Sequence, residues 1–486
     1  MRFLFLFLWG WSQLAWSAEA LTPLRIEPRA IQIRNAGAPD VALLCPRKGP
    51  SSARPSTPPP EPTEIPDEDE VASALEDARV ASGLQPARPA AAWPSNPRGW
   101  RIAVWGDSHM AAAFFSDQLQ RKLAPADAPV SRFVHAGVGH GGVRGLVRKT
   151  CLSGEWAREM AYAHADAASA PGPGMTSLVA KRPGATLALD LRDPQGQPRH
   201  TSLQLLHHGD GAGNTQLAIS VDGEAETLVS LDPQAGPGAL ALQTTAPLST
   251  LKIRVVEGAF RFQGLKLSET PAPAALHMDL FAYPGATAAG WVRSDLSYLA
   301  SWFSDQSYDL ALMAFGTNEG NDPRFNETAY RDMLTAALGH FRQVFPQTQC
   351  VLIGPGDRGI RVVKSKAAKA RKKQAVQSKL SKNTPHKNAQ SNKSDKSSKP
   401  DKAANANKLL KFGRIHQQIG QIQAEVAAVH GCSAWSMQTA MGGVGSAYPW
   451  ARKNPPLMAP DLLHFTPAGY RELANIFLAD FGLNPP

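Results

Sequence analysis

The sequence predicts an α/β protein in which a parallel sheet with helices on both faces is interrupted by an antiparallel β-sandwich. Two observations predict the sheet: the apolar run 102–105 leads into a helical pattern, and so does the run 310–315. A third predicts the sandwich, because short segments rich in Leu, Val, Ile and Thr recur between turns over 175–269. Functional groups of such parallel sheets gather beyond the carboxyl ends of the strands.

The first twenty residues have the pattern of a secretory signal peptide. Arg2 gives a positive start, residues 3–15 form a short apolar run, and Ala18-Glu19-Ala20 fits a cleavage site. The run is too short to span a bilayer, and no later run is long enough. We therefore expect an exported protein, either periplasmic or secreted.

The region that follows the signal segment is predicted to be an extension with little compact structure. Alternating residues within 24–44 favour a strand or two, and 46–66 is rich in Pro and Ser, as in an extended linker. A short helix is predicted near 70–82. Compact structure is expected to begin near Trp100.

The remaining elements follow from apolar periodicity and helix-end signals. Thr466 as N-cap and Pro467 at the first helical position start the last helix. The pattern predicts helices at 109–123, 291–303, 328–345, 412–430 and 467–481, a strand at 350–354 and a glycine-containing loop region at 433–450.

Four cysteines in an exported chain permit two disulfides with three possible connectivities: Cys45, Cys151, Cys350 and Cys432. Cys350 begins an apolar strand, and Cys432 follows a helix at a similar point. Neighbouring parallel strands could bring these two together, so we favour that pair. No two cysteines lie at zinc-ligand spacing, and no metal site is expected.

The net charge of +10 comes from one segment. Residues 361–411 hold 16 of the 51 Lys and Arg but only two of the 41 acids, which leaves 35 basic and 39 acidic residues elsewhere. The folded body therefore carries no nucleic-acid footprint. The segment is low in complexity and predicted to be disordered. It is either a solvated insertion or an arm for an anionic polymer or a membrane surface.

Three separated stretches carry groups suited to acyl transfer. Ser108 lies at a strand-to-helix junction, where free backbone N–H groups favour an oxyanion. Asp461 and His464 lie on one loop, so that a carboxylate can orient an imidazole which takes the serine proton. Asn318 offers a side-chain amide at another strand end. Each piece alone has a simpler explanation, since Asp-Ser pairs cap helices and Gly-Thr-Asn forms turns.

Together these stretches resemble the blocks of the SGNH (GDSL-type) hydrolases: Gly106-Asp107-Ser108, Gly316-Thr317-Asn318 and Asp461-x-x-His464. The resemblance implies a Ser108–His464–Asp461 triad, no cofactor, and an oxyanion hole formed by Ser108, Asn318 and a block-two glycine. Gly285 is our candidate for this glycine, although the chain has Pro-Gly-Ala where many members have Asn-Gly-Ala. The rival candidates lie in the glycine-rich stretch 135–142: Gly139, Gly141 and Gly142.

Within the superfamily, the chain resembles most the exported peptidoglycan O-acetylesterases, which carry Ser-His in the first block and Asn-Glu in the third. Here these are Ser108-His109 and Asn318-Glu319. The resemblance implies a three-layer, flavodoxin-like α/β/α domain with an inserted, jelly-roll-like β-sandwich similar to carbohydrate-binding modules. The predicted division is a signal peptide at 1–20, an extension at 21–99, the hydrolase domain at 100–174, 271–360 and 412–486, the sandwich at 175–270, and the Lys-rich insertion at 361–411.

Three functions stay open at this point. The first is a serine esterase that removes O-acetyl groups from cell-wall glycan through an acetyl-enzyme. The second is an O-acetyltransferase acting on an exported polysaccharide, since the same triad serves both reactions. The third is a non-catalytic glycan-binding protein. The sequence does not identify the native glycan.

Overall fold

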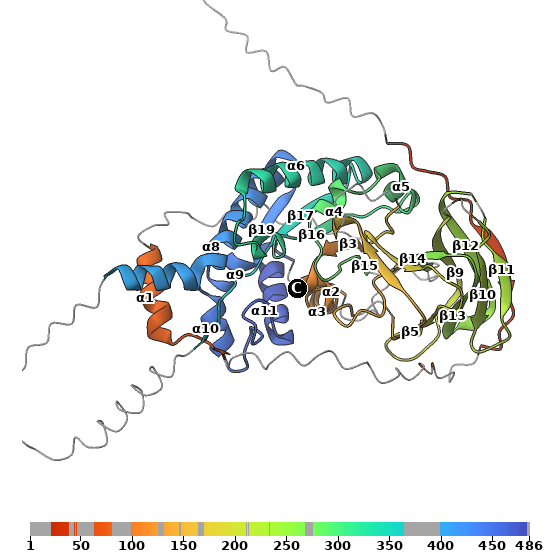
Figure 1. The fold of residues 1–486 in the computed structure, drawn as a ribbon, viewed down its shortest axis with the longest axis horizontal. Helices are drawn as coiled ribbons and strands as arrows, with labels where there is room; N and C mark the ends of the chain where they lie inside the picture. Colours follow the sequence, from red (N-terminus) through yellow and green to blue (C-terminus); the bar gives the residue numbers. More distant parts are fainter. Residues whose placement is uncertain are drawn as a thin grey trace, which may run out of the picture.

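A computed structural model describes residues 21–37, 43, 45, 63–79, 99–124, 131–144, 147–163, 170–209, 211, 213–232, 234–267, 276–363 and 399–483. The β-sandwich lies at one end of the molecule and α1 at the other, with the parallel sheet and its helices between them (Figure 1). The predicted signal peptide at 1–20, residues 46–62 of the linker and residues 364–398 of the Lys-rich insertion lie outside the described residues. None of the helices in the described part has the length and apolar composition required to cross a membrane.

The core of the α/β part is a five-stranded, wholly parallel sheet. Because both faces are buried, its three central strands (100–106, 310–314 and 349–354) are almost continuously apolar. The α/β prediction is confirmed. In spatial order the strands are β15 (Leu276–Leu280), β3 (Trp100–Gly106), β16 (Leu310–Ala314), β17 (Gln349–Gly354) and β19 (Ser433–Ser436).

Alternate residues of each strand enter opposite hydrophobic cores, as the two-residue period of a strand requires. Trp105 and Met313 lie in the core beneath α4 (Ala289–Val292), α5 (Leu296–Ser301), α6 (Glu327–Val344) and α8 (Lys399–Val429). Val104 and Leu312 lie in the other core, with α3 (Phe114–Leu123), α9 (Met437–Met441) and α11 (Pro467–Asp480).

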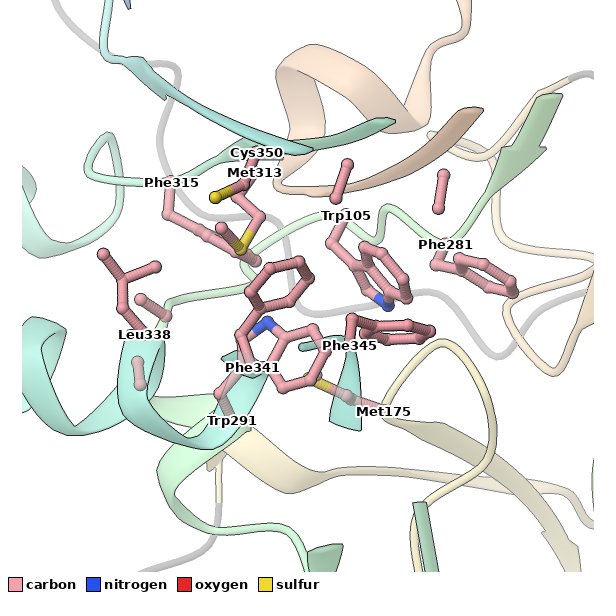
Figure 2. Packing of buried hydrophobic residues seen from close by; sticks show 14 of the residues in the cluster. Trp105, Met175, Phe281, Trp291, Met313, Phe315, Leu338, Phe341, Phe345 and Cys350 are labelled. Atoms are coloured by element: carbon pink, nitrogen blue, oxygen red, sulfur yellow. The ribbon is translucent and has the colours of Figure 1, made fainter. Parts of the chain in front are cut away.

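Trp105 is the centre of the first core (Figure 2). Its ring centroid lies 5.3 Å from that of Trp291, 5.5 Å from Phe345 and 5.0 Å from Phe281. Edge-to-face and offset pairs of this kind add to the burial of large apolar surface. They fix α4 and α6 against the sheet.

The β-sandwich consists of two sheets around a separate apolar core. The larger sheet runs β1 (Arg29–Ile33), β12 (Gly236–Leu248), β9 (His200–Gly209), β14 (Phe260–Leu267), β7 (Thr176–Ala180) and β6 (Ala157–Met160), and β4 (Phe133–His135) also pairs with β14. The smaller runs β11 (Thr227–Ser230), β10 (Gln216–Val221), β13 (Thr250–Glu257), β8 (Thr186–Asp190) and β5 (Lys149–Ser153). All pairs are antiparallel except β1 with β12.

The sandwich recruits strands from outside the predicted range 175–270. Strands β4, β5 and β6 precede Met175, and β1 comes from the N-terminal extension. These strands have three to five residues each, too few to display a clear alternation. Their partners lie far along the chain, so pairing rather than local pattern decides their membership.

Several predicted elements differ in the structure. The helix at 109–123 is two helices, α2 (Ser108–Ala111) and α3, separated where Ala113 takes a left-handed φ of 62°. The helix at 291–303 is likewise split into α4 and α5, because Asp295 caps the second by accepting a hydrogen bond from Tyr298 N. The loop region at 433–450 contains β19, α9 and α10 (Ala447–Arg452).

The Lys-rich insertion was predicted to be disordered throughout 361–411, and this is wrong at both ends. Val362–Val363 forms β18, and α8 begins at Lys399 instead of 412. Leu409 and Leu410 explain the helical end, because both are only 1% exposed within a hydrophobic cluster.

Both disulfides of the chain are formed. Cys350 and Cys432 are bonded with their Cα atoms 4.8 Å apart, as adjacent parallel strands allow, so this prediction is confirmed. Cys45 and Cys151 form the second bond, across 106 residues, and tie the N-terminal extension to β5 of the sandwich.

Residues 63–79 of the extension form a small unit that we term the N-terminal clasp. It comprises β2 (Thr63–Glu64), which pairs with β18, and α1 (Glu68–Arg79), which packs against α8. Val71 and Ala74 of α1 share a buried cluster with Leu462, a residue of the predicted catalytic loop. Arg361 donates to Pro460 O at 2.8 Å and also to Thr63 O, so it links the clasp to that loop.

We expect Ala74→Asp to destabilise the protein and Ala72→Asp to leave its stability nearly unchanged. Ala74 is 2% exposed in the cluster, whereas Ala72 lies on the exposed face of the same helix. A buried, unpaired carboxylate should cost about 3 kcal/mol of unfolding free energy. Urea unfolding followed by tryptophan fluorescence measures the difference, and equal midpoints for the two variants would contradict the packing of the clasp.

Candidate active site

Three loops meet at the carboxyl edge of the parallel sheet. Strand β3 ends at Gly106 and is followed by Ser108, and β16 is followed by the loop with Asn318. The loop after β15 joins them, because Tyr283 N donates to Gly106 O at 2.9 Å. This is the edge at which parallel sheets carry their functional groups.

Ser108 is placed by the turn that precedes it. Asp107 caps α2, since its carboxylate accepts a hydrogen bond from His109 N at 2.9 Å. Gly106 leaves no room for a side chain, because a Cβ there would lie 2.9 Å from Ala314 O. Burial raises the pKa of Asp107 to about 6.

The structure brings Ser108, His464 and Asp461 together. Ser108 Oγ lies 3.0 Å from His464 Nε2, and His464 Nδ1 lies 2.7 Å from Asp461 Oδ2. The other carboxylate oxygen of Asp461 accepts hydrogen bonds from the backbone N–H groups of Leu463 and His464, each at 3.0 Å. An alcohol, an imidazole and a carboxylate in this order can transfer a proton.

The loop that carries His464 is held in one conformation. Leu462 takes a left-handed φ of 57° and is fully buried in the cluster with the clasp. Ala459 N donates to His464 O at 2.7 Å, and Gly359 N donates to Leu462 O at 3.0 Å. A branched side chain at a left-handed φ is costly, so the surrounding contacts must compensate for the strain.

The charge states of Asp461 and His464 depend on each other. The hydrogen bond to Asp461 raises the pKa of His464 from the ordinary 6.5. Partial burial alone would raise the pKa of Asp461, but hydrogen bonds from the His464 side chain and from backbone N–H groups outweigh it and hold that pKa well below its usual range. Asp461 is therefore ionised wherever His464 titrates.

Asn318 and Gly285 lie on adjacent loops. Asn318 Nδ2 donates to Ala286 O at 2.8 Å, and Ala286 N donates to Tyr283 O at 3.1 Å to close a turn. Gly285 takes φ +85° in this turn, is exposed, and has no atom within 4 Å of the position of a Cβ. Within the described residues, no hydrogen bond engages the backbone N–H of Gly285 or of Ser108.

The rival glycines have other surroundings. Gly139 packs towards Thr150 and Leu152 of strand β5, and the N–H of Gly142 donates to His140 Nδ1 at 3.0 Å. Gly141 is exposed, and a Cβ there would meet nothing within 4 Å. The bond from Asn318 to Ala286 thus favours Gly285, whose role stays a prediction.

Glu319 and His109 support the site, although sequence analysis assigned neither of them a role. The two Glu319 oxygens accept from Ala288 N and Gly316 N, each at 3.0 Å, so this carboxylate braces both loops. Burial raises its pKa to about 7. The His109 ring lies 5.4 Å from that of His464, its Nδ1 lies 3.1 Å from Tyr470 Oη, and burial lowers its pKa to about 3.

No protein-family model and no curated protein matches this sequence. Among solved structures, a peptidoglycan O-acetylesterase is similar, with a TM-score of 0.53 and 19% identity over 79% of this chain and 91% of that one. This chain has the fold of the SGNH hydrolases.

Two further structures match less well. A family two carbohydrate esterase from Cellvibrio japonicus matches with a TM-score of 0.17 and 15% identity over 54% of this chain and 99% of that one. A salicylyl-acyltransferase from a tetracycline biosynthetic pathway matches with a TM-score of 0.23 and 13% identity over 64% and 83%. Of these three matches, the peptidoglycan O-acetylesterase is the one with a TM-score above 0.5, and the fold assignment rests on it.

We expect the pKa of the His464 imidazole to lie above 6.5 in the wild-type protein. In the Asp461→Asn variant, we expect the pKa of the same imidazole to lie at or below 6.5. The variant removes the hydrogen bond that raises the pKa, while partial burial, which lowers it, remains. NMR of the histidine Hε1 resonances measures both values, with His464→Gln for assignment. His109 is an internal control that stays neutral from pH 5 to 9. An unchanged pKa in the variant would refute the pairing.

Proposed function

We propose that this protein is a serine esterase that removes O-acetyl groups from a cell-wall glycan. The observation that carries the proposal is the continuous relay from Ser108 Oγ through His464 to Asp461, with contacts of 3.0 and 2.7 Å. The second support is the fold, since a peptidoglycan O-acetylesterase matches over most of both chains. The sandwich beside the site provides a surface for a polymer.

In the proposed reaction, His464 Nε2 accepts the Ser108 proton as Oγ attacks the acetyl carbonyl carbon. The carbonyl oxygen becomes an oxyanion, which receives hydrogen bonds from the N–H groups of Ser108 and Gly285 and from the Asn318 amide. When the C–O bond to the sugar breaks, protonated His464 gives its proton to the sugar oxygen. A water molecule, deprotonated by His464, then attacks the acetyl carbonyl carbon of the acetyl-enzyme. The C–Oγ bond breaks, His464 returns the proton to Ser108 Oγ, and the acetyl group leaves as acetic acid, which ionises to acetate.

We also propose that the protein is exported. Two disulfides, Cys45–Cys151 and Cys350–Cys432, suit an oxidising compartment such as the periplasm or the cell exterior. A cell-wall substrate would be met there. The predicted signal peptide at 1–20 agrees with this location.

We expect Ser108→Ala to lower the release of acetate from O-acetylated peptidoglycan, and the hydrolysis of p-nitrophenyl acetate, by at least about 10⁴-fold. Ser304→Ala is the matched control, because Ser304 is exposed and lies in the turn between α5 and β16. Acetate release is measured with and without an added sugar acceptor. If the acetyl group appears on the acceptor instead of as acetate, the enzyme is a transferase, and if Ser108→Ala keeps full activity, no relay operates.

We expect Asn318→Ala to lower kcat by about 10²–10³-fold while KM changes little, since an oxyanion donor acts mainly in the transition state. Asn475→Ala is the control, because this exposed Asn pairs with Gln118 away from the site. Steady-state kinetics on p-nitrophenyl acetate give both constants. A rise in KM with an unchanged kcat would remove Asn318 from the oxyanion hole.

A further inference from the structure

One loop joins the sandwich to the catalytic edge of the sheet. Residues 136–144, termed the cleft loop, follow strand β4 of the sandwich. Arg144 N donates at 2.9 Å to the carbonyl of Ala111, at the end of the helix that Ser108 begins. The His140 ring lies 5.1 Å from that of Tyr283, two residues before Gly285. The cleft loop therefore contacts both the helix that Ser108 begins and the turn that holds Gly285.

Arg158 of strand β6 reaches this loop from the sandwich. Its Nη2 donates to Val138 O at 2.9 Å, and the side chain is half-buried. Burial lowers the pKa of His140, and the charge of Arg158 lowers it further. Burial raises the pKa of the Tyr283 phenol, and the charge of Arg158 opposes this rise. Arg158 is thus bonded to the loop that carries His140, and the His140 ring contacts Tyr283.

Arg158 lacks a counter-ion within the part of the chain that is described, since no carboxylate there lies within 4 Å. The adjacent Glu159 pairs instead with Arg261 at 2.5 Å. By contrast, four other arginines of the sandwich each pair with a carboxylate: Arg182 with Glu155, Arg192 with Asp190, Arg199 with Asp193 and Arg254 with Glu226.

We propose that Arg158, assisted by His140, binds a carboxylate carried by the acetylated sugar of the glycan. A guanidinium matches a carboxylate with two parallel N–H···O bonds, and the pairing is strongest where both groups are partly desolvated. This specificity-determining site rests on the proposed esterase function. It makes acidic glycans, and not neutral ones, the substrate class.

The test compares two substrates that differ only in charge. O-acetylated, peptide-free peptidoglycan strands carry the lactyl carboxylate of each muramic acid, and carboxyl reduction converts it to an alcohol. For the wild-type protein, kcat/KM for acetate release is expected to be about 10- to 100-fold higher on the carboxylate form, the range of a charge-assisted hydrogen bond. In Arg158→Gln the preference is expected to vanish, chiefly through KM.

The preference is a ratio within one variant, so partial unfolding of Arg158→Gln affects both substrates equally. Arg158→Lys, which keeps the charge, should retain part of the preference. Arg182→Gln is the control, because Arg182 is an exposed sandwich arginine remote from the cleft loop, and should retain all of it.

Equal kcat/KM on both substrates, or a full preference in Arg158→Gln, would overturn the inference. A preference that appears only on strands that keep their peptides would overturn the assignment to a sugar carboxylate. Failure of the proposed function gives a different result, since neither substrate would then release acetate in a Ser108-dependent way.

Discussion

Two backbone hydrogen bonds at the end of β3 hold the site together. Asp107 N donates to Ala314 O at 3.1 Å, and Gly106 O accepts from Tyr283 N at 2.9 Å. They join the serine turn to the ends of β16 and β15. Because a Cβ at Gly106 would collide with Ala314 O, only glycine allows the strands to approach this closely. The spacing of Ser108, Gly285 and Asn318 is therefore a consequence of sheet register.

The histidine side of the site is held by a different set of contacts. His464 lies just ahead of α11, and its loop is held by the buried Leu462 and by the bond from Arg361 to Pro460 O. The cluster around Leu462 includes α1, a helix nearly 400 residues away in sequence. A rigid support of this kind is what precise placement of an imidazole requires, since small displacements are costly in catalysis.

The parts predicted from sequence are those with local signals. The apolar strands of the parallel sheet, the Thr466 cap and the Cys350–Cys432 pair all follow from patterns of a few neighbouring residues. The contact of Ser108 with His464 was expected on another ground, the resemblance of their two stretches to hydrolase blocks. Such signals determine the sheet and the residues at its edge.

The parts that could not be predicted depend on distant contacts. Strands β4, β5 and β6 are too short to alternate visibly, and their place in the sandwich is set by pairing with β14, β8 and β7. Ala113 takes a left-handed φ of 62° and interrupts a helix, although the usual sequence signal for such a break, a glycine, is absent at this position. Leu409 and Leu410 lie at the end of a polar segment of the sequence, yet both are buried against α1 and belong to helix α8.

The order of the chain gives the sandwich a geometric relation to the catalytic edge. The chain leaves the sheet after α3, enters the sandwich at β4 and returns through β14 to β15, which leads to Gly285. Strands β4 and β14 pair with each other, so the exit and the return are adjacent. The cleft loop and the Gly285 turn therefore start from neighbouring strands, and Arg158 is bonded to the first of them through Val138 O. Both connections are anchored in one sheet, so the position of Arg158 relative to the Gly285 turn is set by the pairing of β4 with β14.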